Sequence, residues 1–211
     1  MSTPHLVVVG AGGHARACLD VIEQLGVYRV LGLIGLPEEA GGEHLGYRVI
    51  GTDDDLCRLA KECPHAFVAV GHITSPTVRI RMYERLIELG FRMPDIVAPT
   101  AYVSRHAVIG PGTIVMHGAV INAGAKIGRN CIVNTCAVIE HDAIVADHCH
   151  ISTGAILNGG VQVGKEKRKL EIASIDTREA EAGVPVNDAL AAMEKLIGEK
   201  KPAAIVVGAF R

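Results

Sequence analysis

The sequence has no tryptophan and few other aromatic residues: four Tyr and three Phe among 211 residues. A core built on aromatic side chains is therefore excluded. Twenty-four glycines and a 49% share of hydrophobic residues indicate instead tight turns and packing of small aliphatic side chains. This much apolar sequence is enough to bury a core, which excludes a disordered chain.

The six cysteines lack the C-x-x-C spacing of a zinc ribbon or a disulfide framework, so reduced cysteines in the cytoplasm fit better. The N-terminus, MSTPHLVVVG, has no basic stretch, and its apolar run is too short for a signal peptide or a membrane span. The formal net charge is -2, and the largest basic run is KEKRK at 165–169. We expect a cytoplasmic protein that binds small molecules rather than nucleic acid or membrane.

The first part of the chain, residues 1–95, alternates predicted strands and helices. Strands are expected at 6–9, 30–34 and 66–70, and helices at 15–25, 53–62 and 76–89, with Gly26 ending the first helix. This β-α-β-α-β-α order predicts a small parallel sheet, a Rossmann-like domain.

Residues 96–164 form a six-residue repeat. From Val103 on, the residue two before each repeated aliphatic is small in all but the last case, and strand alternation places the two on one face pointing inward. The two residues after the aliphatic are expected to make a corner. Twelve aliphatics recur at a step of six: Val97, Val103, Ile109, Val115, Ile121, Ile127, Val133, Ile139, Val145, Ile151, Leu157 and Val163.

This period predicts a left-handed parallel β-helix. Three six-residue sides close one coil of the prism, so each inward residue stacks on its equivalent in the next coil. A coiled coil or an α-helix has a different period. About four coils fit between residues 97 and 164, and the flat walls of so short a prism need a partner, so we expect a homotrimer.

The third part, residues 165–211, has no repeat. Its spacing of Leu190, Met193 and Ile197 predicts a helix near 187–199. The simplest interpretation is a cap on the open end of the prism, and no other role is assigned.

Two adjacent residues, His141 and Asp142, are the candidate catalytic pair because they lie at a predicted corner and point outward. A neutral imidazole can accept a proton near pH 7, and a carboxylate stabilises the imidazolium that results. Glu140 is equally placed to be the partner. The alternative is a solvated polar corner without catalytic function.

Further polar residues lie on the same stretch: Asn134, His148 and His150, with Gly159 stacked one coil beyond His141. A glycine there leaves room for a ligand and exposes a backbone N–H that can hold an oxyanion. The run HDAIVADHCH is also a candidate metal site. The inward phase of Cys149 and the different repeat positions of the three histidines argue against metal.

A glycine-rich loop between the first strand and the first helix can cradle a phosphate, and its residues are Gly10, Gly12, Gly13 and His14. The loop also reads G-x-G-x-x-A, so a dinucleotide fold, with Glu38 or Glu39 on the ribose, is an alternative. About three predicted strands are too few for that fold. The glycines can also serve only a tight turn.

Gly71 and His72 follow the third predicted strand, at the carboxyl edge where parallel sheets bind ligands. They are candidate substrate contacts. His72 can equally be a loop histidine without a role in binding.

Together these segments resemble the bacterial sugar acetyltransferases that join a βαβ nucleotide-sugar domain to a left-handed β-helix. That family includes the N-acetyltransferases of the bacillosamine and perosamine pathways and the related sialic acid O-acetyltransferases. The resemblance covers residues 5–164 and is carried by GAGGHA, RMYERLIELGF, PTAYVS, INAGAKIG and, most specifically, VNTCAVIEHDAIVADHCHIS.

The resemblance implies that His141 is the general base and Asp142 its partner, while Asn134, His150 and Gly159 contact the substrate or the acetyl group. It places the nucleotide of the sugar near the glycine-rich loop and acetyl-CoA in the groove between the prisms of a homotrimer. The sugar amine attacks the thioester directly, and no metal is required.

Two features depart from the family pattern. An acidic pair usually follows the second strand, where this chain reads IGLPE at 34–38, so the nucleotide is left open. The hexapeptides also stop at Val163, although family members continue them along the coenzyme A groove.

The leading hypothesis is an acetyl-CoA-dependent N-acetyltransferase for a UDP- or GDP-linked 4-amino-4,6-dideoxy sugar, used in lipopolysaccharide or glycan biosynthesis. The alternatives are a sialic acid O-acetyltransferase, a non-catalytic trimeric sugar-nucleotide-binding protein, and a carbonic-anhydrase-like metal enzyme.

Overall fold

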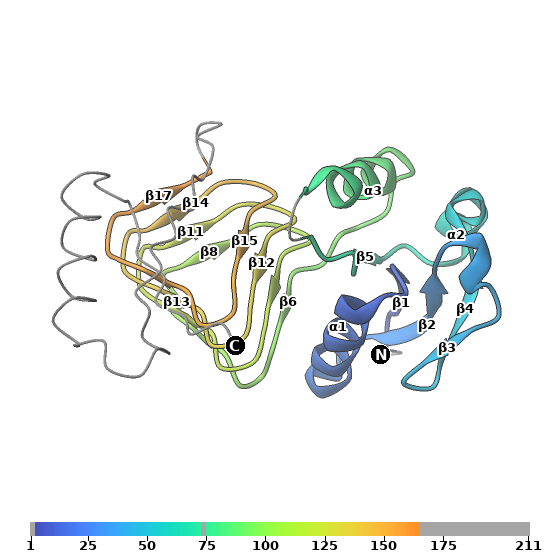
Figure 1. The fold of residues 1–211 in the computed structure, drawn as a ribbon, viewed down its shortest axis with the longest axis horizontal. Helices are drawn as coiled ribbons and strands as arrows, with labels where there is room; N and C mark the ends of the chain where they lie inside the picture. Colours follow the sequence, from blue (N-terminus) through green and yellow to red (C-terminus); the bar gives the residue numbers. More distant parts are fainter. Residues whose placement is uncertain (1–2, 73–74, 165–211) are drawn as a thin grey trace, which may run out of the picture. The chain divides into compact units, whose positions relative to one another are not determined.

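The computed structural model describes residues 3–72 and 75–164 (Figure 1). The predicted helix near 187–199 and the predicted cap both lie outside these residues. No helix in the described ranges is long and apolar enough to cross a membrane.

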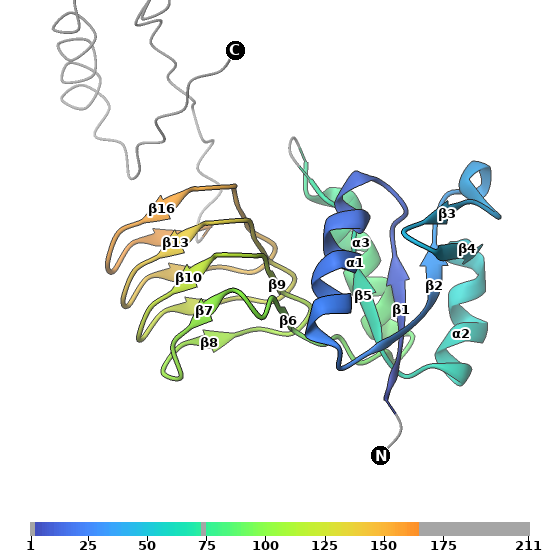
Figure 2. The same cartoon turned by 90° about the horizontal axis from the view of Figure 1, so that it is seen from below.

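The N-terminal part is a five-stranded sheet with the order β3-β4-β2-β1-β5 (Figure 2). All pairings are parallel except that of β3 with β4, which is antiparallel. The strands are β1 (His5–Val9), β2 (Arg29–Ile34), β3 (Glu43–His44), β4 (Tyr47–Gly51) and β5 (Ala66–Val68). The helices are α1 (Gly13–Leu25), α2 (Leu56–Glu62) and α3 (Thr77–Glu88), with 3-10 turns at Pro37–Glu39 and Asp53–Asp55.

The predicted strand count was too low, because β3 and β4 were missed. They form a short hairpin around Leu45 and Gly46, both with positive φ, and β3 has only two residues, too few to show a period. The sheet has five strands, so the expected count of three does not hold as an argument against a dinucleotide fold. The end of α1 was predicted correctly: Gly26 is left-handed, with φ 67°, and its N–H donates to the Ile22 carbonyl.

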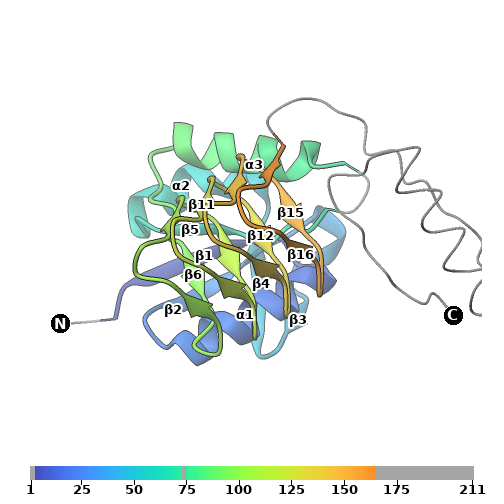
Figure 3. The same ribbon diagram turned by 90° about the vertical axis from the view of Figure 1, so that its left-hand side faces the viewer.

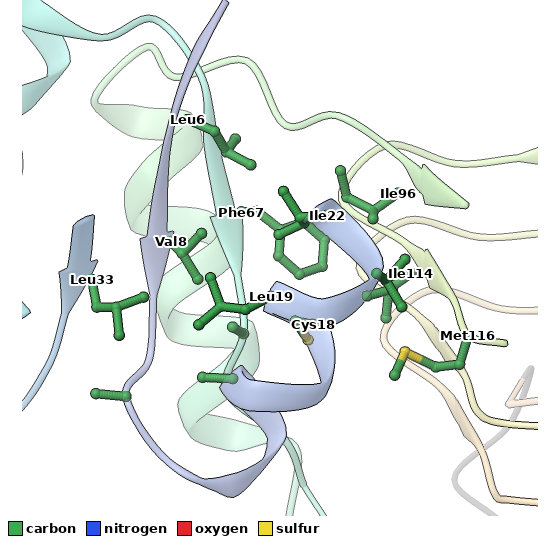
Figure 4. Packing of buried hydrophobic residues seen from close by; sticks show 14 of the residues in the cluster. Leu6, Val8, Cys18, Leu19, Ile22, Leu33, Phe67, Ile96, Ile114 and Met116 are labelled. Carbon is green, nitrogen blue, oxygen red and sulfur yellow. The ribbon is translucent and has the colours of Figure 1, made fainter. Parts of the chain in front are cut away.

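Helix α1 packs on both the sheet and the β-helix. Its buried face, with Cys18, Leu19 and Ile22, shares one hydrophobic cluster with Phe67 of β5 and with Ile114 of the β-helix (Figure 4). His117, at a corner of the β-helix, adds a polar link, with 3.0 Å between its Nε2 and the Asp20 Oδ2 on α1. The described residues belong to one compact unit.

The repeat is a prism of twelve two-residue strands in three parallel four-stranded sheets: β6-β9-β12-β15, β7-β10-β13-β16 and β8-β11-β14-β17 (Figures 1 and 3). These strands are Ile96–Val97, Tyr102–Val103, Val108–Ile109, Ile114–Val115, Val120–Ile121, Lys126–Ile127, Ile132–Val133, Val138–Ile139, Ile144–Val145, His150–Ile151, Ile156–Leu157 and Gln162–Val163.

Each strand pairs with the equivalent strand of the next coil, as the six-residue period predicts. Ile121 pairs with Ile139, and Ile139 with Leu157. The inward aliphatic and small side chains form one hydrophobic core, in which Ala119, Ala137 and Ile139 are fully buried. The left-handed parallel β-helix was thus predicted correctly.

The corners lie one residue later than predicted, at the second and third residues after each inward aliphatic. The third residue is left-handed at every corner from Gly112 to Gly160, with positive φ at Gly112, Gly118, Gly124, Asn130, Cys136, Asp142, His148, Gly154 and Gly160. Positive φ is costly for side chains other than Gly and least so for Asn and Asp. Asp142 suits this position, and the turn fixes its backbone in the left-handed conformation.

Candidate active site

His141 and Asp142 are the two turn residues between β13 and β14, and they form a hydrogen-bonded pair. The distance between His141 Nδ1 and Asp142 Oδ2 is 3.0 Å. Both side chains are largely exposed. The hydrogen bond and the charge of Asp142 raise the pKa of His141 above its usual value, with a smaller contribution from Glu140.

The partner of His141, which the sequence left open between two acids, is Asp142. Glu140 has a different partner, because Asn122 Nδ2 of the preceding coil donates to its Oε2 over 2.9 Å. Asp142 occupies Nδ1 of the imidazole, so Nε2 is the nitrogen that can accept a proton from a substrate. This is the arrangement that a histidine base requires.

Two glycines make room for this pair. A Cβ at Gly159, in the next coil, would lie 2.6 Å from His141 Nε2, and a Cβ at Gly124, in the preceding coil, would overlap Asp142 Oδ1. Among the described residues Gly159 N–H has no hydrogen-bond acceptor, whereas Gly160 N–H donates to the His141 carbonyl over 2.9 Å. A free donor therefore lies beside the base, as an oxyanion site requires.

A second polar cluster joins the N-terminal part to the β-helix. His150 on β15 donates from Nδ1 to the His72 carbonyl over 2.8 Å, and Asn134 Nδ2 donates to His150 Nε2 over 3.1 Å. Because a carbonyl only accepts, His150 carries a proton on Nδ1. The rings of His72 and His150 meet edge to face, with centroids 5.3 Å apart.

His14 completes this cluster from the start of α1. A Cβ at Gly71 would lie 2.9 Å from the Cβ of His14, so Gly71 permits this close approach. Burial and, second to it, the charge of Arg79 lower the pKa of His14 to about 4. Burial, followed by the charges of His150 and Arg79, lowers the pKa of His72 to about 4 as well. Both imidazoles are neutral at pH 7.

The glycine-rich loop divides into two roles. Gly10, with φ 121°, lies where a Cβ would be 3.0 Å from the backbone of Ala69, so it serves a close approach of β1 to β5. Gly12 and Gly13 are exposed and face open space. Helix α1 begins there with no side-chain cap, which leaves its first N–H groups available to an anion.

One chain does not bring the two clusters together. His150 lies on the wall β6-β9-β12-β15, where Ile96, Ile114 and Ile132 pack against the N-terminal part. His141 lies at the corner between the two other walls. The predicted groove residues Asn134 and His150 therefore belong with His14 and His72, and not with His141 and Gly159 of the same chain.

Each of the three histidines in HDAIVADHCH has its own partner. Asn130 Nδ2 donates to His148 Nδ1 over 2.9 Å, His141 bonds Asp142, and His150 bonds His72 and Asn134. Within 3–72 and 75–164 no three His, Cys, Asp or Glu side chains converge as metal ligands.

Sequence reasoning missed Arg79 of α3, which is fully buried. It occupies the apolar stripe formed by Met82, Tyr83 and Leu86, which lie three, four and seven residues further along the helix. An arginine on the buried face of an amphipathic helix is the pattern that could have revealed it.

Two family models match the chain: the PglD N-terminal domain over residues 5–86 and the bacterial transferase hexapeptide (six repeats) over residues 106–141. Among solved structures, the acetyltransferase domain of PglB from Neisseria gonorrhoeae FA1090 is 37% identical, with a TM-score of 0.69 and 76% of each chain covered. Its complex with acetyl coenzyme A is 36% identical, with a TM-score of 0.70 and 77% of each chain covered.

PerB from Caulobacter crescentus, in complex with CoA and GDP-perosamine, is 31% identical, with a TM-score of 0.70 over 76% of this chain and 74% of that chain. Fold and repeat together define the class as an acyltransferase built on hexapeptide repeats. The chain belongs to the bacillosamine and perosamine N-acetyltransferase family.

Proposed function

We propose that this sugar N-acetyltransferase moves the acetyl group of acetyl-CoA to the amine of a UDP- or GDP-linked 4-amino-4,6-dideoxy sugar. The observation that carries the proposal is the His141 imidazole, held at Nδ1 by Asp142 and lying with Nε2 over Gly159. The PglB acetyltransferase domain binds acetyl coenzyme A, and PerB binds CoA and GDP-perosamine, which supports both substrate classes.

In the proposed reaction the sugar amine attacks the carbonyl carbon of the thioester, and His141 Nε2 accepts the proton that the nitrogen loses. Asp142 stabilises the imidazolium, and Gly159 N–H donates to the oxyanion of the tetrahedral intermediate. Collapse of the intermediate breaks the C–S bond. The departing thiolate takes the proton from His141, which leaves an amide, free coenzyme A and a neutral base.

The N-terminal part is proposed to hold the nucleotide sugar. The open surface at Gly12 and Gly13, at the start of α1, suits the diphosphate, because the N–H groups and the helix dipole favour negative charge. His14 and His72 are neutral and lie beside this surface, where Gly71 allows the close approach of His14. Neutral imidazoles there can hydrogen-bond the sugar without adding charge.

The separation of the two clusters supports a site shared between chains. We propose a homotrimer in which His141 of one copy acts on the sugar bound to the N-terminal part of a second copy. The wall β7-β10-β13-β16 offers a contact surface, because its outward residues form an apolar column through all four coils: Tyr102, Val120, Val138 and Ile156. Tyr102 and Ile156 are each 58% exposed in the single chain.

The direct test incubates the purified protein with acetyl-CoA and either UDP-linked or GDP-linked 4-amino-4,6-dideoxy sugar, with free sialic acid as the competing acceptor. We expect thiol release and a product one acetyl group heavier with one of the nucleotide sugars. Acetylation of sialic acid, with no acetylation of either nucleotide sugar, would identify the protein as a sialic acid O-acetyltransferase instead. Binding of the nucleotide sugar without any transfer would identify a non-catalytic binding protein.

A further inference from the structure

Arg79 is buried and charged, yet among the described residues its guanidinium donates to backbone carbonyls only. Its Nη1 donates to the carbonyls of Val68 and Val70 over 2.7 and 2.9 Å, and its Nε donates to the carbonyl of Asn130 over 3.2 Å. Within 3–72 and 75–164 it has no carboxylate partner. A buried guanidinium without a counterion is unfavourable, so the hydrogen bonds that it makes have to offset the cost of its burial.

The three carbonyls belong to the two parts of the candidate site. Val68 is the last residue of β5, and Val70 directly precedes Gly71 and His72. Asn130 is a left-handed corner residue of the β-helix, three residues before Val133 and four before Asn134. The guanidinium therefore connects the backbone that leads to His72 with the coil that carries Asn134.

The same face of α3 makes two more contacts with that corner of the β-helix. Tyr83, one turn further along the helix, donates from its hydroxyl to the Pro111 carbonyl over 3.3 Å, and its ring meets His148 edge to face at 5.7 Å. Asn130 Nδ2 in turn donates to His148 Nδ1. Arg79 and Tyr83 together fix α3 against the β-helix, and Arg79 is the fully buried residue of the two.

We propose that Arg79 is a positioning residue for the acceptor side of the site: by joining the end of β5 to the Asn130 corner, it fixes His72 against His150 and Asn134. The proposal rests on the proposed function, in which these residues line the nucleotide-sugar side. Arg79 acts through the His72 carbonyl, which accepts the hydrogen bond of His150 Nδ1.

The positive charge of Arg79 favours the same arrangement of His72 and His150 as its hydrogen bonds do. It lowers the pKa of His14 and of His72, in addition to the effect of burial. The hydrogen-bond chain requires His150 Nε2 to accept from Asn134, which only an unprotonated Nε2 can do. A cation buried next to this cluster favours neutral imidazoles and therefore favours the observed chain.

Lysine is not an equivalent residue at this position. The planar guanidinium reaches three carbonyls from two different segments through two nitrogen atoms, whereas an ammonium is a single point on a flexible stem. Arg79→Lys keeps the charge but reaches fewer carbonyls. Arg79→Met removes both charge and donors while keeping an unbranched side chain. The two variants together separate charge from geometry.

The experiment compares the full-length wild-type protein with Arg79→Lys, Arg79→Met and the control Arg81→Met, which changes an exposed arginine on the same helix. Long-range 1H-15N spectra of the histidine rings report the protonation and tautomer of His150, with exposed His106 as internal reference. Steady-state kinetics give KM for the nucleotide sugar and for acetyl-CoA separately.

For Arg79→Met we expect loss of the Nδ1–H signature of His150 and a rise of about tenfold or more in KM for the nucleotide sugar, with KM for acetyl-CoA little changed. Arg79→Lys should lie between Arg79→Met and the wild type, and Arg81→Met should match the wild type. If Arg79→Met does not fold, Arg79→Lys carries the same comparison.

Unchanged KM for the sugar together with an unchanged His150 spectrum in a folded Arg79 variant would overturn the proposal. Equal rises in both KM values, without rescue by lysine, would also overturn it and assign Arg79 a general structural role. The spectra do not depend on turnover. Failure of the wild type to acetylate any nucleotide sugar would therefore contradict the proposed function, while the His150 signature still tests Arg79.

Discussion

The imidazole of His141 lies over Gly159 of the next coil, so closely that a Cβ at residue 159 would be 2.6 Å from Nε2. The same nitrogen is the one that Asp142 leaves free. The room that the missing side chain leaves is therefore filled by the imidazole, which lies beside the Gly159 N–H, a donor with no acceptor among the described residues.

Gly159→Ala tests this space with a single methyl group. We expect kcat/KM for acetyl transfer to fall about 100-fold or more, because the methyl group displaces the base and blocks the oxyanion position. Gly159 is not among the residues with positive φ, so alanine fits the backbone and the melting temperature should stay near that of the wild type. Full activity in a folded Gly159→Ala protein would show that the close approach of His141 to residue 159 is not needed for transfer.

Asp142→Asn tests the partner of the base through the pH profile. The carboxylate raises the pKa of His141, and a base is active only when unprotonated, so kcat/KM rises with pH through that pKa. Removing the charge lowers the pKa and moves the acidic limb of the profile to lower pH. The plateau should fall about 10- to 100-fold, because the imidazolium loses its stabilising charge.

Glu140→Gln is the matched control for Asp142→Asn, because Glu140 contributes less to the pKa of His141 and is bonded to Asn122. Its acidic limb should move in the same direction by a smaller amount, with little loss at the plateau. A larger shift from Glu140→Gln than from Asp142→Asn would show that Glu140, and not Asp142, is the partner of His141.

A mixing experiment tests whether the site is shared between chains. His141→Ala removes the base, and Gly13→Asp places a negative charge at the start of α1, where the diphosphate is proposed to bind. Each variant alone should be inactive. Mixed oligomers formed by co-expression should recover activity, up to roughly a quarter of the wild-type value for random assembly, because some interfaces combine two intact halves. No recovery in stable mixed oligomers would place base and sugar in one chain.

Stability should fall in mild acid because of the buried histidines. The pKa of His14 is about 4 in the folded chain and near 6.5 when unfolded, so below pH 6.5 the unfolded state binds more protons. The stability is fully present above about pH 6.5 and is lost progressively down to pH 4, by up to about 3 kcal/mol for His14.

Thermal or urea unfolding between pH 7.5 and 4.5 measures this loss. His14→Gln should flatten the dependence, and the exposed His106→Gln should leave it unchanged. A wild-type unfolding free energy that is constant over this interval would contradict the neutral, buried state of His14.

The β-helix could be predicted from the sequence almost residue by residue, because its period requires an inward aliphatic at each step and stacks equivalent residues in successive coils. That phase also placed His141 and Asp142 outward at a corner. The N-terminal hairpin β3-β4 was missed, because strands of two and five residues around a left-handed turn show no clear period.

The partner of His141 and the separation of the two clusters could not be predicted. The first depends on Asn122, a neighbour only through the stacking of coils, which holds Glu140 away. The second depends on which wall the N-terminal part covers. Two walls carry apolar outward columns, one with Ile96 and Ile114 and the other with Tyr102 and Val120, so the pattern alone favours neither.

The most direct test of the account is a single-turnover comparison of the wild type with His141→Asn. It uses acetyl-CoA and whichever UDP-linked or GDP-linked amino sugar the wild type acetylates. We expect the wild type to form the N-acetylated sugar. His141→Asn should bind both substrates with nearly unchanged affinity and form product at least about 100-fold more slowly. Product formation by His141→Asn at the wild-type rate would contradict the assignment of His141 as the base.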